Sequence, residues 1–169
     1  MNSVVDTARR AKAEYTDGAD RPLGAYLGTL AVYGVTTGAV ALLARRLRDR
    51  PPAVGAADLA LMTVTTHKLS RLIAKDPVTS PLRAPFTRYS GTAGPAELSE
   101  EVRGHGVRHA VGELLTCPFC IGQWVATAYA AGLVFAPEAT RLAGATMTAV
   151  AGSDWLQLLY ARLQQAAED

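Results

Sequence analysis

The chain has 169 residues, of which 49% are hydrophobic, and its 17 basic and 15 acidic residues leave a net charge of +2. One compact domain accommodates this length. Because the charge is close to balanced, the chain lacks the basic field of a nucleic-acid binder, and we expect no nucleic-acid partner. Two cysteines, Cys117 and Cys120, lie too close together in sequence to form a disulfide framework.

Four apolar segments alternate with segments that hold most of the charged residues. They are residues 22–44, 54–73, 114–136 and 142–160. Helices of this length cross a bilayer at about 1.5 Å per residue. The sequence therefore predicts an all-α, polytopic membrane protein: a four-transmembrane-helix bundle with a long connector, residues 74–113, between the second and third helices. The expected location is the cell membrane, with the lipid bilayer as the first partner.

The polar segment 1–21 precedes the first span. It places Val4, Val5 and Tyr15 on one helical face, so we expect either a short helix on the membrane surface or a disordered tail. The apolar run that follows is longer than the roughly 7–15 residues of a signal-peptide core. A cluster of four arginines, Arg45 to Arg50, follows that run directly. Both features favour a retained transmembrane helix over a cleaved signal.

Small residues form a stripe along the first span. Gly24, Gly28, Gly34 and Gly38 lie on one side of the expected helix. In lipid, small residues let another helix approach closely. We expect close packing within the bundle, and the alternative is self-association or binding of another membrane protein through this stripe.

The second span, 54–73, is the most polar of the four. Asp58 lies near its start, and a basic cluster lies at its end, formed by His67, Lys68, Arg71 and Lys75. Charges near the ends of a span can reach the headgroup region, so we expect the segment to cross the membrane. The basic cluster then faces an anionic leaflet, or it pairs with Asp76 and the glutamates of the connector.

The connector 74–113 is long for a compact bundle. Its prolines exclude a continuous helix near residues 77–85, and Gly91 to Pro95 predict a hinge. Glutamates early in the following segment suit the positive end of a helix dipole. We therefore expect a surface helix near 96–113.

The sequence Thr116-Cys117-Pro118-Phe119-Cys120 carries the one candidate for chemistry. Proline suits the first turn of a helix, so the third span is expected to start here. A thiol at a helix N-terminus has a lowered pKa, which favours the reactive thiolate. Three interpretations stay open: buried structural thiols, a redox pair, or a zinc site formed by Cys117, Cys120, His105 and His109.

The last span, 142–160, ends near Asp154 and Trp155, and residues 161–169 form the expected tail. If four helices cross, 12 of the 17 basic residues lie on the side of the two termini and the connector. The positive-inside rule then places both termini in the cytoplasm. A transporter is the least favoured class, because the candidate acidic residues, Asp58 and Asp154, lie near span ends.

Two segments also resemble a known family. They contain Arg71-Leu72-Ile73 with Asp76 and then Pro81-Leu82-Arg83, and Glu113-Leu114-Leu115-Thr116-Cys117-Pro118-Phe119-Cys120. These are similar to a family of small bacterial integral membrane proteins of unknown function, found in actinobacteria and spore-forming bacilli, with some members linked to sporulation. The resemblance covers roughly residues 54–160, implies a membrane location and supplies no reaction.

The leading hypothesis is therefore a structural or partner-binding membrane protein, linked to sporulation or the envelope, with no cofactor and no enzymatic activity. The alternative is a membrane thiol-redox or zinc-binding protein that uses Cys117 and Cys120.

Overall fold

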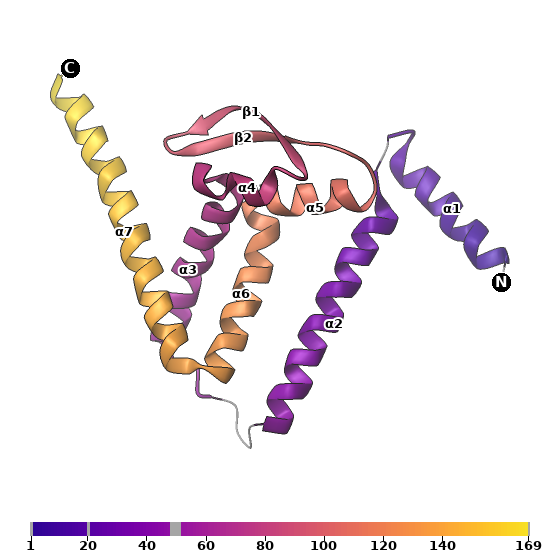
Figure 1. The fold of residues 1–169 in the computed structure, drawn as a ribbon, viewed down its shortest axis with the longest axis horizontal. Helices are drawn as coiled ribbons and strands as arrows, with labels where there is room; N and C mark the ends of the chain where they lie inside the picture. Colours follow the sequence, from indigo (N-terminus) through magenta and orange to yellow (C-terminus); the bar gives the residue numbers. More distant parts are fainter. Residues whose placement is uncertain (1, 20, 48–51, 169) are drawn as a thin grey trace.

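The computed structural model describes residues 2–19, 21–47 and 52–168, and this part of the chain is mostly helical (Figure 1). Its helices are α1 (Asn2–Thr16), α2 (Leu23–Leu47), α3 (Ala56–Lys75), α4 (Ser80–Arg83), α5 (Val107–Thr116), α6 (Pro118–Phe135) and α7 (Pro137–Glu168), with a 3₁₀ turn, η1 (Pro77–Thr79). An antiparallel hairpin joins β1 (Thr87–Gly94) to β2 (Glu97–Val102). The helical prediction is thus confirmed, but the chain is not all-α. Arg48 and Arg50 of the predicted arginine cluster lie outside the described residues.

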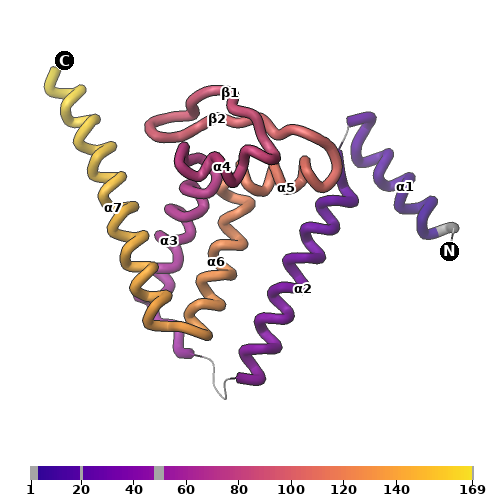
Figure 2. The backbone as a smooth tube through the Cα atoms, in the orientation of Figure 1, coloured from indigo at the N-terminus to yellow at the C-terminus, as the bar shows by residue number. Residues whose placement is uncertain are grey.

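The four long helices run in alternating directions. In the tube view, α3 and α6 lie side by side, α7 crosses them near its own start, and α2 stands on the other side of α6 (Figure 2). The hairpin, α4 and α5 gather at one end of these helices, where α2 begins and α3 ends (Figure 1). The start of α2, the hairpin and the end of α7 are therefore all at the same end of the bundle.

Glycines of α6 and α7 let side chains of neighbouring helices approach them. A Cβ atom on Gly144 would lie 2.1 Å from the hydroxyl of Tyr129, and one on Gly122 would lie 3.7 Å from Thr66. Tyr129, Leu133 and Ala151 are buried at the interfaces of α6 and α7. The absence of a side chain at Gly144 thus makes room for the Tyr129 ring between α6 and α7.

The glycine stripe of α2 is not used in this way. A Cβ atom on Gly24, Gly28, Gly34 or Gly38 would find nothing within 4 Å, and none of the described residues of α2 is buried. Instead, Tyr26 and Tyr33 on the opposite side of α2 contact α5 and α6. The close packing within the bundle that we expected at the glycines is therefore not found.

Two of the described helices, α2 and α6, are long and apolar enough to cross a membrane, whereas the sequence led us to expect four. By length and composition, α3 and α7 do not qualify as candidate membrane spans. The reason lies in their polar residues, because α3 carries Asp58, Lys68 and Arg71, and α7 carries Asp154 and a polar final third. The four-span bundle is therefore not supported by this criterion.

The charges of α3 and α7 face each other. Arg141 donates to the Asp58 carboxylate through Nε at 2.7 Å and Nη2 at 3.0 Å, and Lys68 Nζ lies 2.5 Å from Asp154. Asp58 is buried, and its carboxylate also accepts the amide of Gly55 at 3.3 Å. Two ion pairs thus link the helices at separate levels.

The connector differs from the predicted surface helix near 96–113. Residues 97–102 form β2, paired with β1 in a register that places Thr87 opposite Val102 and Tyr89 opposite Glu100, while α5 begins only at Val107. Gly104 and Gly106 have φ of +87° and +59°, a conformation that interrupts a helix. Of the glutamates that suggested a helix start, Glu97 and Glu100 instead form ion pairs with Arg71 and Arg83. At the other end of the chain, the expected tail 161–169 is helical as far as Glu168.

Candidate functional site

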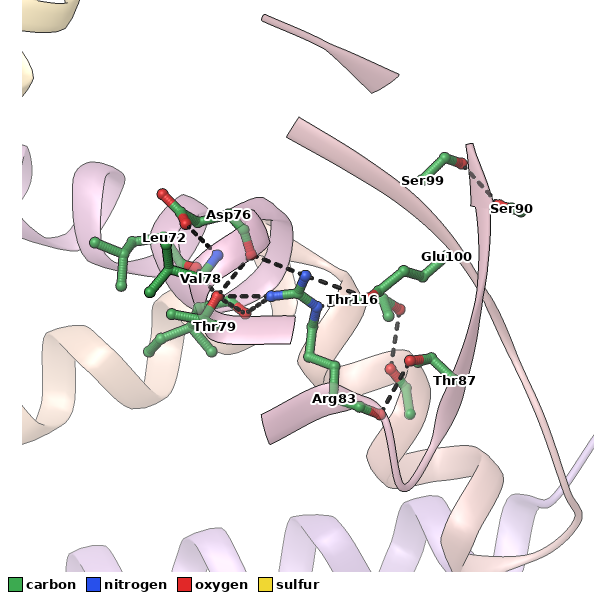
Figure 3. Close-up of polar contacts among 12 residues, drawn as sticks. Leu72, Asp76, Val78, Thr79, Arg83, Thr87, Ser90, Ser99, Glu100 and Thr116 are labelled. Atoms are coloured by element: carbon green, nitrogen blue, oxygen red, sulfur yellow. Dashed lines mark hydrogen bonds and ion pairs between the residues drawn. The ribbon is translucent and has the colours of Figure 1, made fainter. Parts of the chain in front are cut away.

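Arg83 is the centre of a buried polar network at the end of α3 (Figure 3). Its side chain is 0% exposed, and the Glu100 carboxylate from β2 is 6% exposed. Nε and Nη2 donate to Glu100, Nη1 donates to the carbonyl of Ile73 at 2.7 Å, and Nη2 also donates to the carbonyl of Asp76 at 3.1 Å. The remaining Nη1 proton goes to Thr79 Oγ1 at 2.7 Å. All five N–H groups of the guanidinium are therefore used inside the protein.

The chain between α3 and α4 folds so as to supply these acceptors. Asp76 caps η1 by accepting the amide of Val78 at 2.8 Å, and proline follows at the first position of the turn. Thr79 Oγ1 donates to the carbonyl of Leu72 at 2.5 Å, and this carbonyl also accepts the amide of Asp76 at 3.4 Å at the end of α3. Arg83 then reaches back over this turn. Leu72, Asp76, Thr79 and Arg83 are thus joined in one hydrogen-bonded network (Figure 3).

The predicted basic cluster does not form a common patch. Arg71 forms an ion pair with Glu97 of β2, with Nε at 2.9 Å, while Lys68 turns to Asp154 of α7. The His67 ring contacts Trp155, with 6.0 Å between ring centroids. Lys75 is the last residue of α3. The cluster therefore ties α3 to the hairpin and to α7.

Cys117 and Cys120 lie at the junction of α5 and α6. Cys117 is the N-cap of α6, its sulfur accepts the amide of Cys120 at 3.2 Å, and Pro118 is the first helical residue. The two sulfurs are joined in a disulfide. Phe119, between the cysteines, is 92% exposed. Cys120 is itself exposed and Cys117 is half-buried, so the pair is accessible and is not a pair of buried structural thiols.

The predicted zinc ligands are not brought together. His109 Nδ1 lies 3.3 Å from the carbonyl of Gly104, and its Nε2 lies 3.4 Å from Glu113. Within residues 2–19, 21–47 and 52–168, no three His, Cys, Asp or Glu side chains group closely enough to hold a metal ion. The set His105, His109, Cys117 and Cys120 therefore does not form one site in this structure.

Glu113 is a functional candidate that our sequence reasoning did not select. Its carboxylate accepts the Tyr26 hydroxyl at 2.5 Å and lies 3.2 Å from Arg21 Nη1, so it joins the start of α2 to α5. Further along α2, the Tyr33 hydroxyl bonds Thr127 at 2.7 Å and its ring meets Trp124 edge to face at 5.0 Å. An acidic residue directly before a long apolar run could have drawn attention to Glu113.

A pocket of about 280 Å³ lies between these two contacts of α2. Its lining residues come from α2, α5 and α6: Tyr26, Thr29, Leu30, Tyr33, Ala110, Glu113, Leu114, Cys120, Gln123 and Trp124. The wall is mostly apolar and aromatic, with Glu113 and Gln123 as its strongest polar groups. Cys120 is the member of the disulfide that faces this space.

A second pocket, of about 730 Å³, lies between α3, α6 and α7. Apolar side chains such as Leu69, Ile73 and Met147 form nearly all of its wall. Its polar lining residues are Thr65, Tyr129 and Thr146, and none of its lining residues is charged.

Comparisons with known proteins give the following matches. Residues 61–160, more than half of the chain, match the model of a family described as a protein of unknown function (DUF1360). The chain is also similar to the sporulation protein YjcA of Bacillus subtilis (strain 168), with 34% identity over 71 residues. That alignment covers 40% of this chain and 60% of YjcA, so the chain spans about 60% of the length of this relative. No solved structure matches the chain.

Proposed function

The chain belongs to this family of proteins of unknown function, and we propose that it is a multi-pass membrane protein with a structural or partner-binding role linked to sporulation or the envelope. The Arg83 network carries this proposal. Every N–H of the Arg83 guanidinium is bonded to the protein itself. This buried cation therefore stabilises the fold and has no donor left for a ligand. The hairpin is thereby fixed as a platform at one end of the bundle.

Pairing of charges supports four crossings. Charged residues inside a membrane are costly unless they are paired or reach an interface. Asp58 with Arg141 and Lys68 with Asp154 satisfy this requirement between α3 and α7. With α2 and α6 as the two apolar spans, α3 and α7 cross as an ion-paired couple, and both termini share the cytoplasmic side with the hairpin.

Labelling of single cysteines tests this topology. In a Cys117→Ser/Cys120→Ser background, we expect a membrane-impermeant maleimide to label Glu138→Cys in intact cells, and to label Ser90→Cys in the hairpin only after lysis. Labelling of both positions in intact cells would place the hairpin and the start of α7 on the same side of the membrane, and would refute the four-span arrangement.

The partner-binding surface is the glycine stripe of α2. Nothing within the described chain approaches Gly24, Gly28, Gly34 or Gly38, although such stripes serve close helix contact in lipid. The proposed partner is a second copy of the chain. We expect Gly28→Leu/Gly38→Leu to convert a dimer in lipid nanodiscs into a monomer, whereas Thr36→Leu, at an exposed position of α2 away from the stripe, leaves the dimer intact. A monomeric wild-type protein would refute self-association.

We also propose a second candidate function, thiol-disulfide exchange at Cys117 and Cys120. The accessible disulfide at the start of α6 favours it. On the cytoplasmic side, disulfides are usually transient and catalytic or redox-sensing. We expect the pair to cycle between disulfide and dithiol when cells are treated with oxidant or reductant, as measured by acid trapping and maleimide mass shift. A pair that stays in one state under both treatments would refute this function.

A further inference from the structure

The pocket lined by α2, α5 and α6 places the disulfide beside a space between the two helices, α2 and α6, that are long and apolar enough to cross a membrane. Cys120, one of the two cysteines, lines this pocket, and Glu113 lines it from α5. The other wall is α2, where Tyr26 and Tyr33 form hydrogen bonds to α5 and α6. A molecule dissolved in the membrane can therefore approach Cys120 between the two helices.

The pocket wall specifies the shape and polarity of such a molecule. Tyr33 and Trp124 meet edge to face and offer flat aromatic surfaces, while Leu30 and Leu114 are aliphatic. Gln123 provides both a hydrogen-bond donor and an acceptor, and Glu113 provides a carboxylate that already accepts the Tyr26 hydroxyl at 2.5 Å. A planar, apolar ring with carbonyl oxygens at its edges fits this combination of groups.

We propose that this pocket binds the head group of a lipid-soluble quinone, which oxidises the Cys117–Cys120 dithiol. The inference rests on the thiol-disulfide function proposed above and names its electron acceptor. Cys117 is suited to act as the thiolate, because its sulfur accepts the Cys120 amide at the positive end of α6. Cys120, which faces the pocket, is the sulfur that reacts with the quinone.

The reaction balances with one quinone per dithiol. Two S–H bonds break and one S–S bond forms, and the two electrons and two protons released convert the quinone to a quinol. Glu113 is the pocket group that carries a proton from a thiol toward a quinone oxygen. The disulfide is then reduced by thiol-disulfide exchange with the dithiol of a partner protein, which leaves that protein oxidised and restores Cys117 and Cys120 as thiols.

The test uses the full-length protein in detergent, reduced, freed of reductant and kept without oxygen. Decylubiquinone is the probe, because its fully substituted ring does not form stable thiol adducts. We expect one quinol per protein, a rate that saturates with quinone, and no reaction of Cys117→Ser/Cys120→Ser. Leu30→Trp, which fills the pocket, should raise the half-saturating quinone concentration about ten-fold, while Val35→Trp on the outer face of α2 should not change it.

Two further measurements separate the possible failures. Glu113→Gln should lower the saturated rate by about 100-fold and flatten its dependence on pH, as expected for loss of a proton carrier. Diamide, a small water-soluble oxidant, should form the disulfide in wild type and Leu30→Trp at equal rates. Two results with active diamide would refute the quinone inference and leave thiol exchange standing. In one, the quinone does not oxidise the cysteines; in the other, the quinone oxidises wild type and Leu30→Trp alike. If neither oxidant forms the disulfide, both proposals fail.

Discussion

Replacement of Arg83 by methionine should destabilise the protein severely. The substitution leaves the buried Glu100 carboxylate without its partner and removes the donors to the carbonyls of Ile73 and Asp76. Removal of one partner of a buried ion pair typically costs about 3–5 kcal/mol, because the remaining charge is uncompensated. We therefore expect the free energy of unfolding of Arg83→Met to fall by about that amount.

The double variant Arg83→Met/Glu100→Met separates the cost of leaving the Glu100 charge unpaired from the cost of losing the hydrogen bonds of Arg83 to the backbone. With both charges replaced by apolar groups, most of the lost stability should return, since a buried ion pair often contributes little against a hydrophobic pair. Recovery should be incomplete, because the carbonyls of Ile73 and Asp76 still lack the donors that Arg83 supplied, a loss worth about 1–3 kcal/mol.

Reversible unfolding in mixed detergent micelles, followed by circular dichroism, gives these free energies. Arg88→Met is the matched control, because Arg88 lies on the same hairpin but is exposed, and its effect should stay within about 0.5 kcal/mol. Proteolysis of the hairpin should accelerate in Arg83→Met and not in the control. Equal stability of Arg83→Met and Arg88→Met, or a double variant no more stable than the single one, would refute the reasoning.

Other substitutions test the packing of α7 and the hairpin turn. Gly144→Ala should lower the free energy of unfolding by about 1–3 kcal/mol, because its Cβ would lie 2.1 Å from the Tyr129 hydroxyl. Gly152→Ala on the same helix has nothing within 4 Å and should be neutral or slightly stabilising; equal thermal shifts of the two variants would contradict the proposed packing. Ala96→Gly should stabilise the hairpin by up to about 1 kcal/mol, because Ala96 has φ of +56°. The same change at Ala93, inside β1, should destabilise it, and slower proteolysis of Ala93→Gly than of Ala96→Gly would count against this explanation.

Local patterns in the sequence determined several features of the protein. Residues 22–44 and 114–136 are apolar over a length that only a helix buried in protein or lipid accommodates. The first segment folds as α2, and the second ends α5 and continues from Pro118 as α6. The prolines from Pro77 to Pro85 end α3 and permit only short helical turns, because proline lacks the N–H that a helix interior requires. Pro118 likewise marks the start of α6. Each of these effects acts within a few residues.

Only the tertiary structure decided what the charges do. Asp58 pairs with Arg141, 83 residues away, Tyr26 with Glu113, 87 residues away, and Arg83 with Glu100. The hairpin depends on such contacts as well, since an isolated two-stranded hairpin is marginal at best and glutamate favours strands weakly. It forms because Arg83 and Arg71 hold β2 against the end of α3. No local propensity encodes these pairings, because their free energy exists only once the distant partners have been brought together and removed from water.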